Sequence, residues 1–171
     1  MSALTPEQRE RIAILVSYEW VCDIEGQPHD ENERQSDENL AHLLSKCESA
    51  LELHEMVLEI SKGDCWEDAG RVLLNHPFCD YATWLAAFWR LAPSWFEQFV
   101  DESELMQHGY HDKRWDFIRK AEAWLCSSDR SSAQLHFDPT NDDGIDWTRE
   151  YSDRYHPEGF YKIPDILKQP I

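Results

Sequence analysis

The sequence predicts an all-α protein, built as a single bundle of about six helices with a long, ordered and mostly irregular C-terminal tail. Apolar residues recur three and four positions apart through most of residues 1–128, which is the period of an amphipathic helix. From residue 129 onward Pro, Gly and Asp interrupt that period, yet aromatic residues are more frequent than in a disordered tail. We therefore expect residues 1–128 to form a helical body and residues 129–171 to wrap over it within the same domain.

A rigid corner at residues 75–80 separates two apolar helices in this prediction. Pro77 lacks an N–H group and disfavours helical geometry in the residue before it, so the first of these helices should end near Asn75. Asp80 occupies the N-cap position of the second helix. Its carboxylate can accept a hydrogen bond there from the amide of Thr83 or of a neighbour.

The helix that begins at Tyr81 should be the most buried of the chain, because its apolar residues are large and its alanines allow close packing. Pro93 should end this helix, and the segment from Ser94 to Glu97 offers a capping box for the next one. The apolar positions of the Tyr81 helix are Trp84, Leu85, Phe88 and Leu91.

The first helix is marked by Thr5, Pro6 and Gln8, which combine an N-cap, a first-turn proline and a third-position amide. This helix should end at the Gly26-Gln27-Pro28 string. Residues 29–36 are polar and lack an apolar period, so we expect a mobile loop there. The inward face of the first helix is predicted to be Ile12, Leu15, Val16 and Trp20.

A long second helix is expected from Ser36 or Asp37 to about Ser61, before Gly63. A histidine on its apolar stripe is more often a satisfied core residue than a ligand. Four glutamates on the other side should form an acidic ridge on the surface. The stripe is Leu40, Leu44, Cys47, Leu51, His54 and Leu58, and the acidic ridge is Glu48, Glu52, Glu55 and Glu59.

Shorter elements complete the prediction. Asp64 opens a short helix that leads to the corner, and a helix and a short apolar segment follow Ser94. Asp112 should cap a further helix that runs to about Cys126. Pro164 should open a last helical turn in the tail. The inward residues of the Asp112 helix are expected to be Trp115, Ile118, Ala121 and Leu125, and the last turn should run through Leu167.

The net charge narrows the classes of partner. The chain has 34 acidic and 16 basic side chains, which give a formal charge of −18. Such a surface repels nucleic acid and anionic membranes and attracts basic proteins, although solubility alone is an equally good reason for acidity. The acidic residues concentrate in residues 1–62 and 138–158, so a basic partner should bind at the two ends of the chain. The sequence has no recognisable signal peptide or long apolar segment, which predicts a cytoplasmic protein.

A catalytic interpretation starts from Cys79, with His76 and Asp80 close to it in the sequence. A cysteine nucleophile needs a base within hydrogen-bonding reach, and a helix N-terminus lowers the pKa of a thiol. Apolar neighbours at a packed corner favour an inert thiol instead, with His76 capping the preceding helix. The five cysteines include no CxxC pair, which favours reduced thiols and argues against zinc.

Part of a calcium-loop pattern is present at Asn141, Asp143 and Glu150. The first ligand position, however, falls on Pro139, which has no side-chain oxygen. Asx-type turns in an acidic loop are the favoured interpretation. We expect no metal and no cofactor.

Two strings of residues resemble a small uncharacterised bacterial domain family. The first string is Asn75-His76-Pro77-x-Cys79-Asp80-x-x-Thr83, followed by the apolar segment from Leu85 to Trp89. The second string is Asp138-Pro139-Thr140-Asn141-Asp142-Asp143-Gly144, then Asp146-Trp147-Thr148, Glu150-Tyr151 and Ile163-Pro164. The resemblance covers residues 50–95 and 136–168.

The resemblance implies a function in binding, because small acidic members of such families are suspected to be immunity proteins against interbacterial toxins. The expected partner is a cognate protein toxin with a basic cleft, which the acidic protein would occlude without a cofactor. A small Cys/His hydrolase or transferase and a non-catalytic regulatory adaptor are the alternatives. The candidate contact residues are Asp30, Glu31, Glu33, Glu48, Glu52, Glu55, Glu59, Asp142, Asp143, Asp146 and Trp147.

Overall fold

The computed structural model confirms the all-α class and describes residues 3–18, 38–60, 70, 72–73, 75–107, 113–149 and 156–171. Within these ranges there is no β-strand, and Asp142 and Ile145 form an isolated bridge. No helix in them is both long and apolar enough to cross a bilayer. The labelled helices are α1 (Pro6–Tyr18), α3 (Ala50–Glu59), α5 (Tyr81–Arg90), α6 (Glu102–Gln107) and α7 (Lys113–Ser127), with 3-10 turns η1 (Pro93–Gln98), η2 (Arg130–Ser132) and η4 (Asp165–Lys168). Residues 38–44 are also helical.

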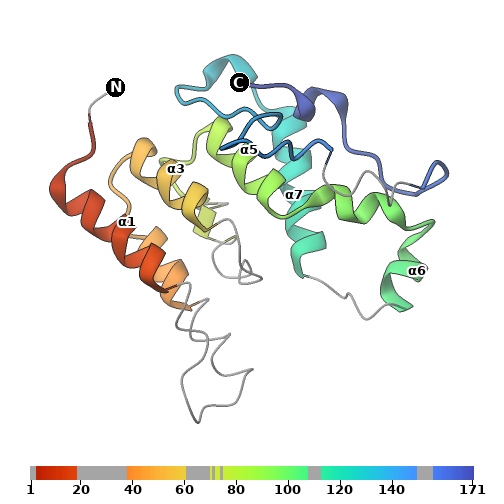
Figure 1. Ribbon diagram of the computed structural model, residues 1–171, viewed down its shortest axis with the longest axis horizontal. Coiled ribbons are helices and arrows are strands. Elements are labelled where there is room, and N and C mark those ends of the chain that lie inside the picture. The colour runs from red at the N-terminus through yellow and green to blue at the C-terminus, as the bar shows by residue number, and fades with distance from the viewer. Residues whose placement is uncertain are drawn as a thin grey trace, which may run out of the picture.

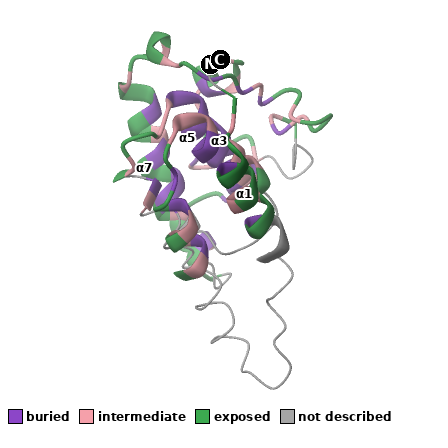
Figure 2. Cartoon of the chain, turned by 90° about the vertical axis from the view of Figure 1, so that its left-hand side faces the viewer, coloured by how far each residue is buried: buried purple, intermediate pink, exposed green. Residues whose placement is uncertain are grey.

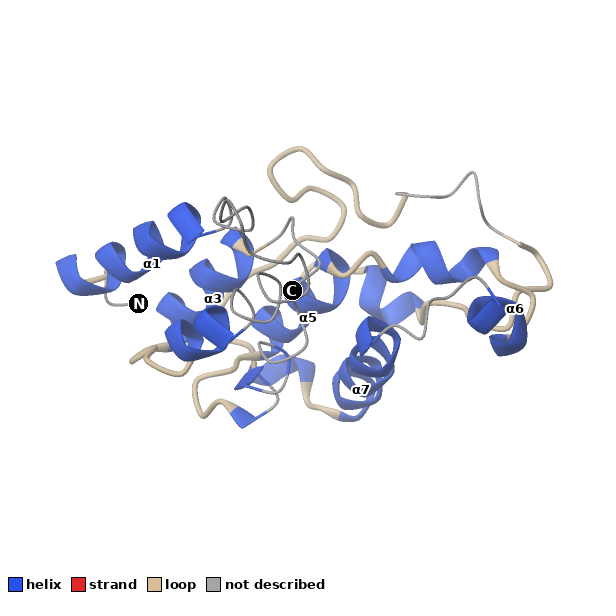
Figure 3. Ribbon diagram, turned by 90° about the horizontal axis from the view of Figure 1, so that it is seen from below, coloured by secondary structure: helices blue, strands red, loops and turns tan. Residues whose placement is uncertain are grey.

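Helix α5 lies at the centre of the bundle, as its sequence predicts. The helices α1, α3, α5 and α7 pack side by side in that order, and α6 lies at the end opposite to α1 (Figures 1 and 3). Every residue of α5 from Tyr81 to Trp89 is buried, whereas the outer helices α1 and α7 show many exposed residues (Figure 2). The burial of this apolar surface is the main driving force for folding.

The corner before α5 has the predicted cap. The backbone N–H of Ala82 donates to Asp80 Oδ1 at 2.8 Å. The second carboxylate oxygen, Oδ2, accepts from the backbone N–H of Gln134 at 2.8 Å. One aspartate therefore starts the central helix and also fastens the beginning of the tail to it.

The start of α1 is also as predicted. The backbone N–H of Thr5 donates to Gln8 Oε1 at 2.9 Å, and the backbone N–H of Gln8 donates to Thr5 Oγ1 at 3.3 Å, which is a reciprocal capping box. Leu15 is buried and Ile12 packs against the core. The side chains of Val16 and Trp20, the predicted end near Gly26 and the loop 29–36 lie outside the described residues, as does the Asp64 helix start.

The predicted single helix from 36 to 61 is wrong, because the chain forms two helical segments with a turn between them. Residues 38–44 are helical and residues 45–46 form a turn. Ser49 then starts α3, and its side chain accepts from the backbone N–H of Glu52 at 3.2 Å. A serine side chain competes with helical hydrogen bonding and favours the N-cap. The predicted stripe holds at Leu40, Leu44, Cys47 and His54, which are buried, but Leu51 and Leu58 are only half-buried. The buried apolar residues of α3 and its C-cap are Leu53, Met56, Val57 and Ile60.

The predicted capping box from Ser94 to Glu97 is also wrong. The residue before η1 is Ala92, which adopts a left-handed conformation with φ of 50° and makes no side-chain cap. The hydroxyl of Ser94 is buried without a hydrogen-bond partner. The proline at position 93 already supplies the fixed φ that begins a helical turn, so η1 begins two residues earlier than the sequence pattern suggests.

The buried face of helix α7 and the end of the tail follow the prediction, and the predicted Asp112 cap lies outside the described residues. Ile118, Ala121 and Leu125 are buried and Trp115 is half-buried. Pro164 precedes η4, in which Leu167 is fully buried. The carbonyl of Leu167 accepts from Trp89 Nε1 at 2.8 Å, so the tail is bonded to the central helix.

The last residues of the chain are held by their main chain. Phe137 and Ile171 exchange two backbone hydrogen bonds, of 3.1 Å and 3.0 Å. The Arg130 guanidinium donates to the carbonyls of Ile166, Gln169 and Pro170. These contacts lay the tail over the ends of α5 and α7, and Figure 1 shows this part of the chain in blue.

Candidate binding face

The structure brings together two of the three acidic segments that the sequence singles out. Arg90, at the end of α5, lies close enough to Asp142 and Asp143 of the tail and to Glu59 of α3 to be attracted by all three carboxylates. Glu55, one turn before Glu59 on α3, is repelled by it. We call Glu59 and Asp143, together with their chain neighbours Glu55 on α3 and Ile145 on the turn, the α3–turn face. The third segment, with Asp30, Glu31 and Glu33, lies outside the described residues.

The tail contributes to this face through a tight turn. The backbone groups of Asp142 and Ile145 exchange two hydrogen bonds of 2.9 Å each. Between them Asp143 and Gly144 both have positive φ angles, of 49° and 86°, as in a type I′ turn. Aspartate and glycine are residues that tolerate this geometry. The turn presents an exposed carboxylate at Asp143 and an apolar side chain at Ile145, which is 41% exposed.

A buried ion pair holds the turn in place. Arg90 Nη2 lies 2.7 Å from Asp142 Oδ2, and the two side chains are only 7% and 9% exposed. Trp147 Nε1 donates to the same oxygen at 2.8 Å, and the guanidinium carbon of Arg90 lies 5.9 Å from the centre of a Trp147 ring. Burial lowers the pKa of Arg90, and the carboxylate of Asp142 is the largest influence that opposes this shift.

Two of the candidate contact residues therefore have structural roles. Trp147 is 8% exposed, so it is not the exposed aromatic anchor that the sequence suggested. Asp142 is occupied by Arg90 and Trp147. The exposed apolar residue of the turn is Ile145, which the sequence analysis did not select because nothing in the pattern distinguished it from a core residue.

The other tail acids form the predicted Asx turns. Asp138 Oδ1 accepts from the backbone N–H of Thr140 at 2.9 Å, and Asp146 Oδ1 accepts from the backbone N–H of Thr148 at 3.2 Å. Asp146 also pairs with Arg149 at 3.2 Å. No group of three metal-ligating side chains occurs within the described parts of the chain, and Glu150 of the calcium pattern lies outside them.

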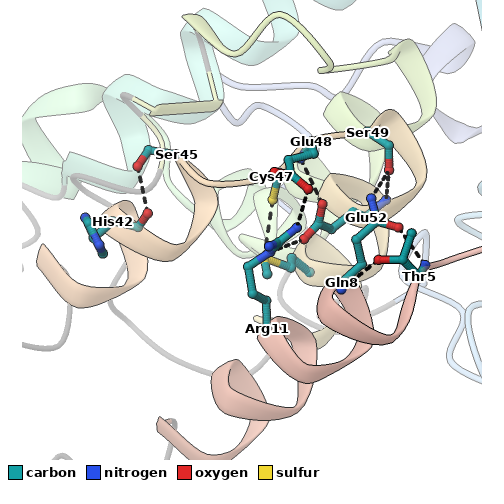
Figure 4. A network of polar contacts seen from close by, with 10 residues as sticks. Thr5, Gln8, Arg11, His42, Ser45, Cys47, Glu48, Ser49 and Glu52 are labelled. Carbon is teal, nitrogen blue, oxygen red and sulfur yellow. Dashed lines mark hydrogen bonds and ion pairs between the residues drawn. The ribbon is translucent and has the colours of Figure 1, made fainter.

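The acidic ridge of the sequence analysis is interrupted at Glu52. This side chain is fully buried, and its Oε1 lies 2.6 Å from Arg11 Nε of α1. Its Oε2 accepts from the backbone N–H of Glu48 at 2.8 Å. In Figure 4 the side chains of Arg11 and Glu52 point toward each other from α1 and α3. The pair is an internal connection, and Glu52 is not a contact residue on the surface.

The remaining ridge glutamates differ in their surroundings. Glu48 also pairs with Arg11, at 3.1 Å, but its side chain is 70% exposed. Glu59 is exposed and Glu55 is half-buried. Partial burial raises the pKa of Glu55, and repulsion from Glu59 raises it further. The C-terminal half of α3 thus carries two glutamates, Glu55 and Glu59, that repel each other.

The residues of the catalytic interpretation do not form an activated nucleophile. Burial raises the pKa of the Cys79 thiol, and the nearby Asp80 carboxylate raises it further, whereas a nucleophile needs the thiolate. The His76 ring accepts from the backbone N–H of Phe78 at 3.3 Å and hydrogen-bonds to the backbone of Leu44. The prediction that His76 caps the helix before it is therefore wrong, because it bonds to the end of helix 38–44. Cys47, Cys79 and Cys126 are free thiols.

Comparison with known proteins identifies only the middle of the chain. No curated protein and no solved structure matches this chain. Residues 52–126 match the family model described as "Domain of unknown function (DUF4274)". The match includes the Asn75 to Thr83 string, α5 and α7 up to Cys126, and it leaves out α1 and the tail. Residues 52–126 are thus similar to a small uncharacterised domain family, and the match covers less than half of the chain.

Proposed function

We propose that this chain is a cytoplasmic binding protein that neutralises a cognate antibacterial toxin by occluding a basic surface on it. In this proposal it acts as an immunity protein, it carries out no reaction and it needs no cofactor. The resemblance of its sequence to a domain family with suspected immunity members supports this choice. The match of residues 52–126 to an uncharacterised family is compatible with it.

The observation that carries the proposal is the arrangement of charge on the α3–turn face. Arg90, the arginine that Glu59 and Asp143 attract, is directed into a buried pair with Asp142. Glu59 and Asp143 are both exposed on this face. Ile145 adds an exposed apolar side chain on a turn that two backbone hydrogen bonds and a buried ion pair keep rigid.

The physical basis is electrostatic complementarity. An acidic surface accelerates encounter with a basic cleft, and salt screens this effect. Apolar side chains that become buried at the centre of an interface slow dissociation. A rigid turn loses little conformational freedom on binding, which favours affinity.

The first experiment is co-expression with the protein encoded by the adjacent open reading frame. Protection of cells from that protein and co-purification of the two chains are the expected results. Normal growth without this chain, or killing despite it, contradicts the proposal for that partner. A pull-down from the native lysate then serves to find another basic protein.

Site variants test the face once a partner is purified. Glu59→Gln with Asp143→Asn removes two charges while keeping the side-chain size, and asparagine tolerates a positive φ. We expect a weakening of about tenfold, mainly in the association rate at low salt. Asp116→Asn with Glu158→Gln is the matched control, because it removes two exposed charges that belong to α7 and to the tail after residue 156. Equal effects of the two double variants contradict the α3–turn face as the contact surface.

A further inference from the structure

His54 occupies a junction of three parts of the molecule. It projects from α3 and is 4% exposed. Its Nδ1 lies 3.1 Å from Thr83 Oγ1 of α5, and its ring also hydrogen-bonds to the backbone of His136 in the tail. The prediction of a satisfied core histidine is thus confirmed. The structure adds that its two partners belong to two other elements, one of them the tail.

The hydrogen bonds at this junction define a proton state. The bond to the His136 backbone favours the protonated ring, which shows that the ring donates and the backbone carbonyl accepts. A neutral imidazole has one donor and one acceptor nitrogen. Its hydrogen is therefore directed to His136, and Nδ1 accepts from the Thr83 hydroxyl. A second proton, on Nδ1, would replace that accepted hydrogen bond and place a charge in the core.

The charged groups around His54 come from both elements packed against it. Asp80 and Asp142 favour the imidazolium, and Arg90 opposes it. Both carboxylates already have partners: Asp80 accepts from the amides of Ala82 and Gln134, and Asp142 from Arg90 and Trp147. Burial is the strongest influence, and it lowers the pKa of His54 from its ordinary value.

We propose that His54 is a proton-sensitive latch, whose neutral ring joins the tail segment 133–147 to α3 and α5 and whose protonation releases that segment. This inference concerns the fold alone and does not depend on the proposed function. If the segment opens, the His54 ring enters water and regains an ordinary pKa of about 6.5. The open form then binds a proton that the closed form rejects, so a fall in pH favours opening.

The sign and size of the effect follow from this difference. Because the pKa of His54 is lowered in the closed form, the stabilisation is complete above about pH 6.5 and is lost as the pH falls toward the lower value. If His54 stays neutral in the closed form, the opening equilibrium constant should rise about tenfold between pH 7.5 and pH 5.5.

Hydrogen exchange of backbone amides tests the latch. The reporters are the N–H groups of Gln134, Phe137 and Trp147, which donate to Asp80, Ile171 and Pro139. After correction for intrinsic exchange rates, we expect their opening to increase about tenfold at the lower pH relative to the amides of α7. An equal increase in α7 would mean global loosening and would overturn the proposal.

Two variants separate the latch from general acid effects. His54→Gln keeps a donor for the His136 carbonyl but cannot titrate, so the pH dependence of the tail amides should disappear. His136→Gln, at an exposed histidine of the same segment, should leave the pH dependence of the tail amides unchanged. Persistence of the full pH dependence in His54→Gln overturns the latch. If that variant does not fold, NMR titration of the wild-type ring decides, and a midpoint at or above 6.5 overturns the proposal.

Discussion

Replacement of Asp142 by asparagine should destabilise the protein strongly, because it leaves a buried charge on Arg90 without its counter-ion. The two side chains are 7% and 9% exposed and their atoms approach to 2.7 Å. Asparagine has the same size as aspartate and can still accept from Trp147 Nε1. The loss therefore reports mainly the missing charge. Removing one member of a buried ion pair costs about 3–5 kcal/mol.

We expect Asp142→Asn to lower the free energy of unfolding by about 3 kcal/mol, a large part of the stability of a typical domain. The double variant Arg90→Met with Asp142→Asn should recover most of this loss, because it also removes the unpaired cation. Urea unfolding monitored by far-UV circular dichroism and tryptophan fluorescence gives the free energies, with a double-mutant cycle that includes Arg90→Met alone. A loss below about 1 kcal/mol, or a double variant no more stable than Asp142→Asn, would refute the reasoning.

Two further substitutions test other close contacts. Arg11→Met should lower the free energy of unfolding in urea by about 3 kcal/mol, because the fully buried Glu52 loses its partner at 2.6 Å. The control is Arg9→Met, at an exposed arginine of the same helix, which should change the free energy of unfolding by less than about 0.5 kcal/mol. Gly159→Ala should lower the melting temperature by several degrees. An added Cβ would lie 2.8 Å from the Glu97 carbonyl oxygen and 2.9 Å from the Phe99 carbonyl oxygen, and overpacking of this kind costs about 1–3 kcal/mol. An unchanged melting temperature for this variant would mean that the tail can shift away from η1 without cost.

The family match and the packing divide the chain differently. The match ends at residue 126, whereas the core includes Leu15 of α1 and Trp147, Tyr161, Ile163 and Leu167 of the tail. Residues 52–126 thus have apolar surface that α1 and the tail cover. Truncation to the matched residues would expose that surface, so experiments on this protein need the full chain.

The candidate face was only partly predictable. The composition identified acidic segments near residues 48–59 and 142–146, because charge can be counted without a structure. It could not show that Glu59 and Asp143 lie around the same arginine, since 84 positions separate them in the chain. Nor could it show that Glu52 and Trp147 are buried while Ile145 is exposed.

The sequence by itself determined the local features: the all-α class, the capping box at Thr5, the Asp80 cap and the core face of α5. Such features depend on hydrogen bonds and apolar spacing within a few residues. Only the tertiary structure decided that the chain breaks before Ser49, that Arg11 and Arg90 turn inward and that His54 contacts the tail. Those outcomes depend on distances between segments remote in sequence, and an ion pair or hydrogen bond in the core exists only where packing brings its two members within about 3 Å.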